Sequence, residues 1–228
     1  MGASVGAIIV AAGRSTRMGG VDKLFALLGG RPLLAHTLAA FQASPSVEAI
    51  VLVAAADGLK GARQLVADSA FAKVAAVCQG GPRRQDSVRA GLDALGPCQW
   101  VLVHDGARPL VTAGLIEEAL AAAREMGAAV PAVPIADTVK ETDGQGHILR
   151  TLDRSSLWAA QTPQAFRYDL LCRAHREVAA DVTDDAAMLE ALGLPVKVFP
   201  GSPLNLKVAT PEDLRLAEAL LLAVRPVS

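Results

Sequence analysis

The sequence predicts an α/β domain built on a mostly parallel sheet with helices on both of its faces. Short apolar runs alternate with segments of helical periodicity along most of the chain. The runs are apolar throughout, which is typical of strands buried on both faces of a sheet. With 228 residues, the chain is long enough for one well-buried domain and short for two. We therefore expect a single domain over residues 1–228.

The expected strands and helices alternate along the first 135 residues. Strands are predicted at Val5–Val10, Val47–Ala55, Lys73–Gln79, Gln99–His104 and Ala128–Ile135. Helices are predicted at Pro32–Gln42, Asp57–Ser69, Gln85–Leu95 and Thr112–Met126. Such units form a Rossmann-like sheet with right-handed crossovers, and ligands bind such sheets beyond the carboxyl ends of the strands. Functional residues are therefore expected in the loops that follow these strands.

The alternation is interrupted between about 136 and 152, where polar and β-branched residues flank Asp143–Gly146. This pattern predicts a β-hairpin arm. Because a two-stranded ribbon is marginally stable alone, we expect the arm to pack against a second copy of the chain in a homodimer. After the arm, the predicted elements are helices at Arg167–Val178 and Asp184–Leu192, a strand at Pro195–Phe199 and a closing helix from Pro211.

The composition argues against several classes of protein. The 22 Lys and Arg residues against 23 Asp and Glu give a net charge of −1, so nothing indicates binding to nucleic acid or to an anionic membrane. The three cysteines match neither a disulfide framework nor a cysteine-rich metal site, and we expect reduced thiols in a cytoplasmic protein. The first apolar run is too short to span a membrane and lacks the basic segment of a signal peptide.

Small and cationic residues follow the first predicted strand directly, in Ala11–Lys23. The segment matches neither a Walker loop nor the dinucleotide-binding glycine pattern. Backbone N–H groups of a glycine-rich turn can surround a triphosphate, while Arg17 and Lys23 neutralise the charge that grows as pyrophosphate leaves. A surface loop with solvated charges is the alternative. The position after the first strand favours the phosphate site.

A second glycine pair, Gly80-Gly81, follows the third predicted strand and precedes a helix. Glycines at such a turn suit the flat face and ribose of a nucleotide. The alternative is that the segment only makes a turn and that Asp86 or Ser87 caps the helix. Similarly, Thr183 before two acidic residues fits an ordinary helix N-cap as well as it fits a binding residue.

The fourth predicted strand is followed by Asp105. A carboxylate there suits Mg²⁺, which prefers one or two carboxylates together with substrate phosphates. Arg108 can hold a second anionic substrate through two hydrogen bonds. The alternative is that Asp105 caps the next turn and pairs with Arg108. His104, beside an apolar strand, is more typical of a structural histidine than of a catalyst.

Taken together, these residues resemble nucleotidyltransferases of the sugar-nucleotide type, most closely the 2-C-methyl-D-erythritol 4-phosphate cytidylyltransferase family. The resemblance extends nearly from end to end, through Ala11–Gly13 with Arg17 and Lys23, Gln85–Val88, His104–Pro109, Asp153-Arg154, Thr162–Gln164, Thr183–Asp185 and Asn205–Lys207. It implies a fold of the nucleotide-diphospho-sugar transferase type. It also implies that CTP and a polyol phosphate are joined with release of pyrophosphate, by in-line attack of the acceptor phosphate and without a protein nucleophile.

The resemblance also implies roles for single residues. The catalytic residues would be Arg17, Lys23, Arg154 and Lys207, of which the first two stabilise the transition state. The nucleotide would contact Ala11, Ala12, Gly13, Gly81, Ser87, Asp105 and Gly106, and Asp105 would also lie near Mg²⁺. The acceptor side would comprise Arg108, Thr138, Arg154, Thr162, Thr183 and Lys207. Thr138 and Arg154 would come from the other subunit of the homodimer.

The chain departs from the family pattern in three places, of which the first is Val10, where proline usually precedes Ala-Ala-Gly. Asp22-Lys23-Leu24 stands where Pro-Lys-Gln is common, and Pro82 lacks the N–H that usually follows the glycine pair. Two other functions stay open. A ribitol 5-phosphate cytidylyltransferase would share the loop, the arm and the metal site, and a catalytically silent nucleotide-sensing module would share the fold. The presence of Arg17, Lys23 and Asp105 argues against the sensor, which needs no transition-state stabilisation.

Overall fold

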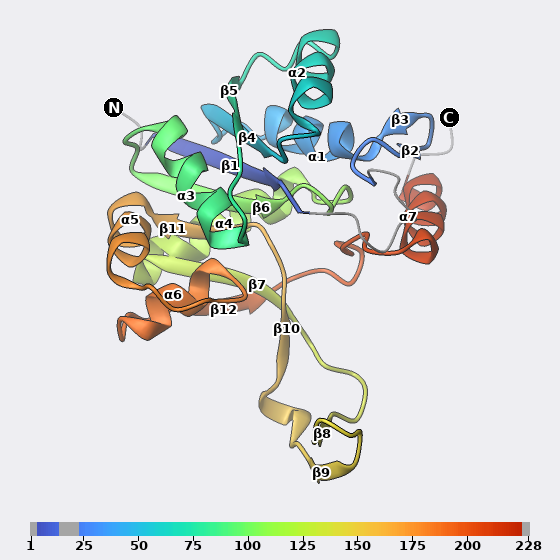
Figure 1. The fold of residues 1–228 in the computed structure, drawn as a ribbon, viewed down its shortest axis with the longest axis vertical. Helices are drawn as coiled ribbons and strands as arrows, with labels where there is room; N and C mark the ends of the chain where they lie inside the picture. The colour runs from blue at the N-terminus through green and yellow to red at the C-terminus, as the bar shows by residue number, and fades with distance from the viewer. Residues whose placement is uncertain (1–3, 14–22, 225–228) are drawn as a thin grey trace.

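A single large sheet forms the centre of the molecule in the computed structural model, which describes residues 4–13 and 23–224 (Figure 1). Its central strands are parallel neighbours, with β1 between β4 and β6, and β5 beside β4. Their bounds are β1 Val5–Ala11, β4 Ala49–Ala54, β5 Val74–Gln79, β6 Trp100–Asp105 and β7 Ala128–Pro134. The five predicted strands are therefore present, and β4, β5 and β6 form the parallel part of the sheet around β1, as predicted.

Helices cover both faces of the sheet, because alternate residues of each buried strand point to opposite sides. Ile9 and Leu102 belong to one core cluster, whereas Ile8 and Val103 belong to the other. The first face is covered by α1 Leu33–Ala43, α2 Leu59–Asp68, α4 Ala113–Met126 and α7 Pro211–Val224. The second is covered by α3 Arg84–Leu95, α5 Tyr168–Glu177 and α6 Asp185–Ala191.

The sheet is mixed at one side because a strand that the sequence does not predict lies between β6 and β7. This strand, β11 Gln164–Arg167, runs antiparallel to both neighbours. β10 Trp158–Ala160 pairs antiparallel with β7, and β12 Lys197–Pro200 pairs parallel with it. With only two buried apolar residues, β11 has little hydrophobic signal of its own, and hydrogen bonds to both neighbours make it a strand.

A second unpredicted feature is the small hairpin of β2 Leu27–Leu28 and β3 Arg31–Pro32. Gly29 and Gly30 connect its strands, with φ angles of 57° and 81°. A two-residue hairpin turn of this kind requires positive φ, which glycine adopts without strain. Among the described residues, the helices all lack the combination of length and apolar character that crossing a membrane requires.

The predicted arm is present and projects away from the sheet (Figure 1). It consists of β8 Lys140–Thr142 and β9 Ile148–Thr151, followed by a 3₁₀ turn at Arg154–Ser156. The Asp143 carboxylate shapes the turn by accepting the backbone N–H groups of Gln145 at 2.8 Å and His147 at 2.9 Å. The two apolar residues at the start of β9, Ile148 and Leu149, are 62% and 63% exposed.

Candidate active site

Three loops meet at the carboxyl edge of the sheet, after β1, β5 and β6. A Cβ atom added to Gly80 would lie 2.4 Å from the Ala12 Cβ, so only glycine allows the first two loops to approach this closely. The Gly106 N–H donates to the Val10 carbonyl at 2.8 Å, which joins the third loop to β1. Six of the predicted nucleotide-binding residues, Ala11, Ala12, Gly13, Gly81, Ser87 and Gly106, therefore lie in or beside these loops, as expected.

The glycine pair after β5 is held in shape by Ser87. Its hydroxyl oxygen accepts the Gly81 N–H at 3.2 Å and donates to the Arg83 carbonyl, also at 3.2 Å. The carboxylate of Asp86 accepts the backbone N–H of Arg83 at 3.2 Å, so Asp86 supplies the cap of α3. Ser87 consequently ties the loop after β5 together instead of capping the helix.

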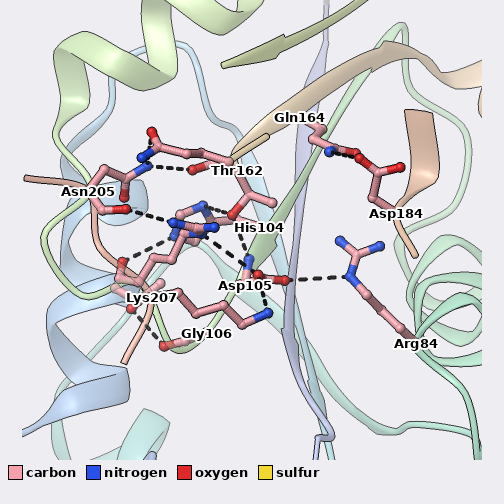
Figure 2. Close-up of polar contacts among 12 residues, drawn as sticks. Arg84, His104, Asp105, Gly106, Thr162, Gln164, Asp184, Asn205 and Lys207 are labelled. Carbon is pink, nitrogen blue, oxygen red and sulfur yellow. Dashed lines mark hydrogen bonds and ion pairs between the residues drawn. The ribbon is translucent and has the colours of Figure 1, made fainter. Parts of the chain in front are cut away.

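Asp105 ends β6 and is surrounded by cations (Figure 2). Its carboxylate lies 2.8 Å from Lys207 Nζ, 3.5 Å from Arg84 Nε and 3.8 Å from Arg108 Nε. Burial raises the pKa of Asp105, but the three positive charges outweigh it and hold the pKa well below the usual range of a carboxyl group. Asp105 is therefore a carboxylate at neutral pH, and the expected pairing with Arg108 is present as part of a larger cluster.

The segment that contains Lys207 is fastened beside Asp105 by buried hydrogen bonds. A terminal nitrogen of Arg108 donates to the Asn205 carbonyl at 2.7 Å, and the Asn205 amide donates to the Thr162 carbonyl at 2.8 Å. The Val208 N–H donates to the Ala107 carbonyl at 2.8 Å. Residues from three distant parts of the chain therefore form one rigid wall of the site.

His104 has a structural role, as its position beside the apolar strand predicts. Thr162 Oγ1 accepts the Asp105 N–H at 3.0 Å and lies 3.0 Å from His104 Nδ1, while His104 Nε2 lies 3.2 Å from the Arg108 carbonyl. We assign the proton to Nε2, because Nδ1 then accepts from the threonine hydroxyl and Nε2 donates to the carbonyl. Burial lowers the pKa of His104 to about 4, so the ring is neutral at pH 7.

The buried histidine makes stability depend on pH. Between pH 6.5 and about 4, the unfolded chain binds a proton at His104 that the folded protein does not, so the free energy of unfolding falls as pH falls. The expected contribution is about 1.4 kcal/mol per pH unit. Urea unfolding at pH 7, 6 and 5 should show a shallower dependence for His104→Asn than for the wild type. An unchanged slope in His104→Asn would contradict this assignment.

The remaining predicted residues lie elsewhere or outside the described part of the chain. Arg17 and Asp22 lie outside the described residues. Lys23 acts on Asp213 of α7. Burial raises the pKa of Asp213, but hydrogen bonds and the positive charge of Lys23 lower it by more. Thr138 and Arg154 are exposed on or beside the arm, where the Arg154 guanidinium donates to the Ala136 carbonyl.

Thr183 is exposed and does not cap α6, so the interpretation of this residue as the N-cap is wrong. The cap is Asp184, whose carboxylate accepts the Ala187 N–H at 3.1 Å. Asp184 also accepts a hydrogen bond from the Gln164 amide at 2.7 Å. Asp184 caps the helix instead of Thr183 because the turn before α6 places the Asp184 side chain next to the free N–H groups of the helix.

Arg84 is not among the residues predicted from the sequence, yet its guanidinium contacts both Asp105 and Asp185. A signal for it exists in the helical period. Arg84 lies four and eight residues before Val88 and Leu92, which are both buried, and residues at this spacing share one face of a helix. The same spacing places Arg83 before Ser87 and Gly91, which are also buried, so the period does not by itself separate the two arginines. Arg83 pairs at the surface with Asp86 at 2.8 Å.

Asp105 is the one group of this cluster that can ligate Mg²⁺, because the three cations around it are hydrogen-bond donors without a lone pair for a metal. Across residues 4–13 and 23–224, no three His, Cys, Asp or Glu side chains gather in a way that would bind a metal without other ligands. A single carboxylate is what Mg²⁺ takes from a protein when phosphate oxygens and water supply the other ligands. Asp105 is such a carboxylate, since it is ionised and lies beside the glycine loops.

Comparisons with known proteins agree along the whole chain. The model of the 2-C-methyl-D-erythritol 4-phosphate cytidylyltransferase family matches residues 5–223. The protein of that name from Dehalococcoides mccartyi is 54% identical over 217 residues, which cover 95% of this chain and 96% of the relative.

Solved structures give the same result. The structure of 4-diphosphocytidyl-2C-methyl-D-erythritol synthase from Anaerococcus prevotii matches with a TM-score of 0.84 and 30% identity, covering 96% of each chain. The structure of 2-C-methyl-D-erythritol 4-phosphate cytidylyltransferase from Thermus thermophilus matches with a TM-score of 0.78 and 35% identity, covering 94% of this chain and 98% of the other. By sequence and by fold, this chain belongs to the 2-C-methyl-D-erythritol 4-phosphate cytidylyltransferase family.

Proposed function

We propose that this protein transfers the cytidylyl group of CTP to 2-C-methyl-D-erythritol 4-phosphate and releases pyrophosphate. The observation that supports this most directly is the ionised Asp105 among three cations, next to two glycine loops at the carboxyl edge of the sheet. The identity of both substrates comes from the family and from the names of its members. An acceptor phosphate oxygen would bond to the α-phosphorus while the bond to the leaving pyrophosphate breaks.

On the nucleotide side, we assign the base and ribose to the two glycine loops. Ala11, Ala12 and Gly13 follow β1, and Gly81 with Ser87 forms the facing loop. These small residues let the backbone approach a flat ring closely. Asp105 would hold Mg²⁺, which when bound neutralises negative charge on the phosphates as pyrophosphate leaves. Arg17 and Lys23 are assigned to the same growing charge.

On the acceptor side, we assign the phosphate to Lys207 and Arg108. The Lys207 side chain is 48% exposed and lies 2.8 Å from Asp105, so its ammonium can exchange that partner for a substrate phosphate. The Arg108 guanidinium is buried and anchored to Asn205, which fixes its charge in place. Thr162 contributes by holding the Asp105 backbone and the Asn205 side chain.

We also propose a homodimer in which the arm of one subunit completes the site of the other. The exposed apolar residues Ile148, Leu149 and Trp158 provide surface for the second copy to cover. Thr138 and Arg154 would then reach the acceptor bound in the other subunit's site. Thr183 lies on the body of the subunit and would contact the acceptor in its own site. Arg154 supplies a guanidinium that can bind the acceptor phosphate.

Replacing Arg154 by alanine is expected to raise the acceptor KM about tenfold with little change in the KM for CTP, because only acceptor binding loses a charge-assisted hydrogen bond. A mixed dimer with Lys23→Ala subunits should regain sites of wild-type acceptor KM, since one of its two sites then combines an intact Lys23 with an intact Arg154. Steady-state rates at low acceptor concentration measure this. If mixing restores nothing, Arg154 acts within its own subunit.

The proposed reaction is tested by pyrophosphate release from CTP and Mg²⁺ with one polyol phosphate at a time. We expect turnover with 2-C-methyl-D-erythritol 4-phosphate and little with ribitol 5-phosphate. Turnover with ribitol 5-phosphate alone would establish the alternative acceptor. Tight binding of CTP without turnover on either acceptor would establish a nucleotide sensor.

We further propose a cytoplasmic location. Cys78, Cys98 and Cys172 are all free thiols, and proteins of reducing compartments rarely form disulfides. This agrees with the location expected from the cysteine count of the sequence. Cell fractionation followed by detection of the protein checks it, and recovery from a membrane or extracellular fraction would contradict it.

A further inference from the structure

We propose that Arg84 is a positioning residue of this active site, whose guanidinium bridges Asp105 and Asp185 and so fixes the orientation of the Asp105 carboxylate. This inference rests on the proposed function, in which Asp105 holds the metal at the substrate phosphates. It adds a residue to that site which the resemblance does not include, together with a buried carboxylate behind it.

The geometry of Arg84 is that of a bridge between two elements of the fold. Its Nε lies 3.5 Å from Oδ1 of Asp105 at the end of β6, and one terminal nitrogen donates to Oδ2 of Asp185 in α6 at 2.5 Å. A guanidinium is planar and rigid, so two contacts through different nitrogens define its orientation. A lysine ammonium at this position would have no such fork and would act as a point charge.

Asp185 holds Arg84 from the side away from the substrates. Asp185 is 1% exposed, so it has no surface with which to contact a ligand. Its other carboxylate oxygen lies 3.5 Å from His175 Nε2 on α5. Asp185 is therefore enclosed by α3, α5 and α6, and it restrains the guanidinium of Arg84 through a contact that solvent does not screen.

The two oxygens of Asp105 consequently have different partners. Oδ1 faces Arg84, which Asp185 holds in place. Oδ2 faces Lys207 at 2.8 Å, whose side chain is about half exposed, and the buried Arg108 at 3.8 Å. Thr162 fixes the backbone of Asp105 through the hydrogen bond to its N–H. The backbone and Oδ1 of Asp105 are therefore both held in place. Oδ2 is the oxygen that can exchange the exposed Lys207 ammonium for a metal ion.

One observation shows what this orientation costs. Nη2 of Arg84 is buried and has no hydrogen-bond partner among the described residues. A buried donor without a partner is unfavourable, and rotation of the guanidinium to satisfy it would break the contact with Asp105 or with Asp185. The guanidinium thus contacts both carboxylates, while its Nη2 is left without a hydrogen-bond partner in the described part of the chain.

The test separates positioning from simple charge balance. Arg84→Met alone leaves the buried Asp185 carboxylate without its arginine and with only His175 beside it, and we expect a clear loss of thermal stability. The double variant Arg84→Met with Asp185→Asn removes both charges and should regain most of the melting temperature. Arg84→Lys keeps the charge but not the bridge. The matched control is Arg83→Met, which removes an exposed arginine from the same turn.

In the double variant we expect near wild-type melting temperature, a kcat lowered about 10- to 100-fold, and a KM for CTP within about threefold of the wild type. Arg84→Lys should fold and lose about tenfold in kcat, whereas Arg83→Met should retain wild-type kcat. A double variant that is stable and has wild-type kcat would show that Arg84 only balances Asp185, and would overturn the inference. Full activity in Arg84→Lys would do the same. If the wild type itself releases no pyrophosphate, the proposed function is wrong, and the inference about Arg84 fails with it.

Discussion

Asp105→Asn is expected to lower kcat about 10³-fold while the protein remains folded. Asparagine has nearly the same shape, but it removes the negative charge that faces Lys207 and Arg84 and that would hold Mg²⁺ at the phosphates. Its amide would also place a donor group against cationic donors. Because the charge is needed most as pyrophosphate departs, the loss should appear in kcat more than in the KM for CTP. Pyrophosphate release over a range of Mg²⁺ concentrations measures it.

The control for this variant is Asp143→Asn. The Asp143 carboxylate also has a side-chain partner, His147 Nδ1 at 3.0 Å, but it lies in the turn of the arm. Near wild-type kcat is expected for it. If Asp105→Asn kept more than about a tenth of the wild-type kcat at all Mg²⁺ concentrations, the metal site would have to be moved away from β6.

Lys23→Ala is expected to lower kcat by about 10² or more with only a modest change in the affinity for CTP. The reason is that the ammonium interacts most strongly with the charge that develops as the bond to pyrophosphate breaks. Calorimetric titration with CTP gives the affinity, and a steady-state assay gives kcat. Since Lys23 also acts on Asp213, the melting temperature of the variant is measured to separate folding from catalysis.

Lys60→Ala serves as the control for Lys23→Ala, because Lys60 is an exposed lysine on α2. It should change neither kcat nor CTP affinity appreciably. Equal losses of affinity and rate in Lys23→Ala would mean that Lys23 binds the ground state and the transition state alike. Its role would then be binding and not transition-state stabilisation.

The core of the fold could be predicted because its strands are buried on both faces. Runs such as Val5–Val10 are apolar at every position, and this signal needs no information about neighbours. β11 had no such signal, since Ala165 and Phe166 are its only buried apolar residues. It is a strand because β6 and β7 offer hydrogen bonds on both sides, which is a property of the assembled sheet.

In the site too, some residues could be predicted from the sequence and others depend on the folded structure. Asp105 and the glycine loops were predicted from their places at the ends of strands, and the structure brings them together. Lys207 and Thr162 were known only from the resemblance, and their approach to Asp105 depends on the path of the chain through β11 and the segment after β12. Arg83 and Arg84 are chemically identical, and only the folded structure places Arg83 at the surface with Asp86 and Arg84 between Asp105 and Asp185.

From the sequence by itself came the α/β class, the arm and the edge of the sheet where chemistry occurs, because apolar runs and turn residues act locally along the chain. The tertiary structure alone decided that Arg84 and Lys207 join Arg108 around Asp105, and that Asp185 holds Arg84. Those contacts join residues about 20 to 100 positions apart, and their distances follow from how the elements pack and not from any local pattern.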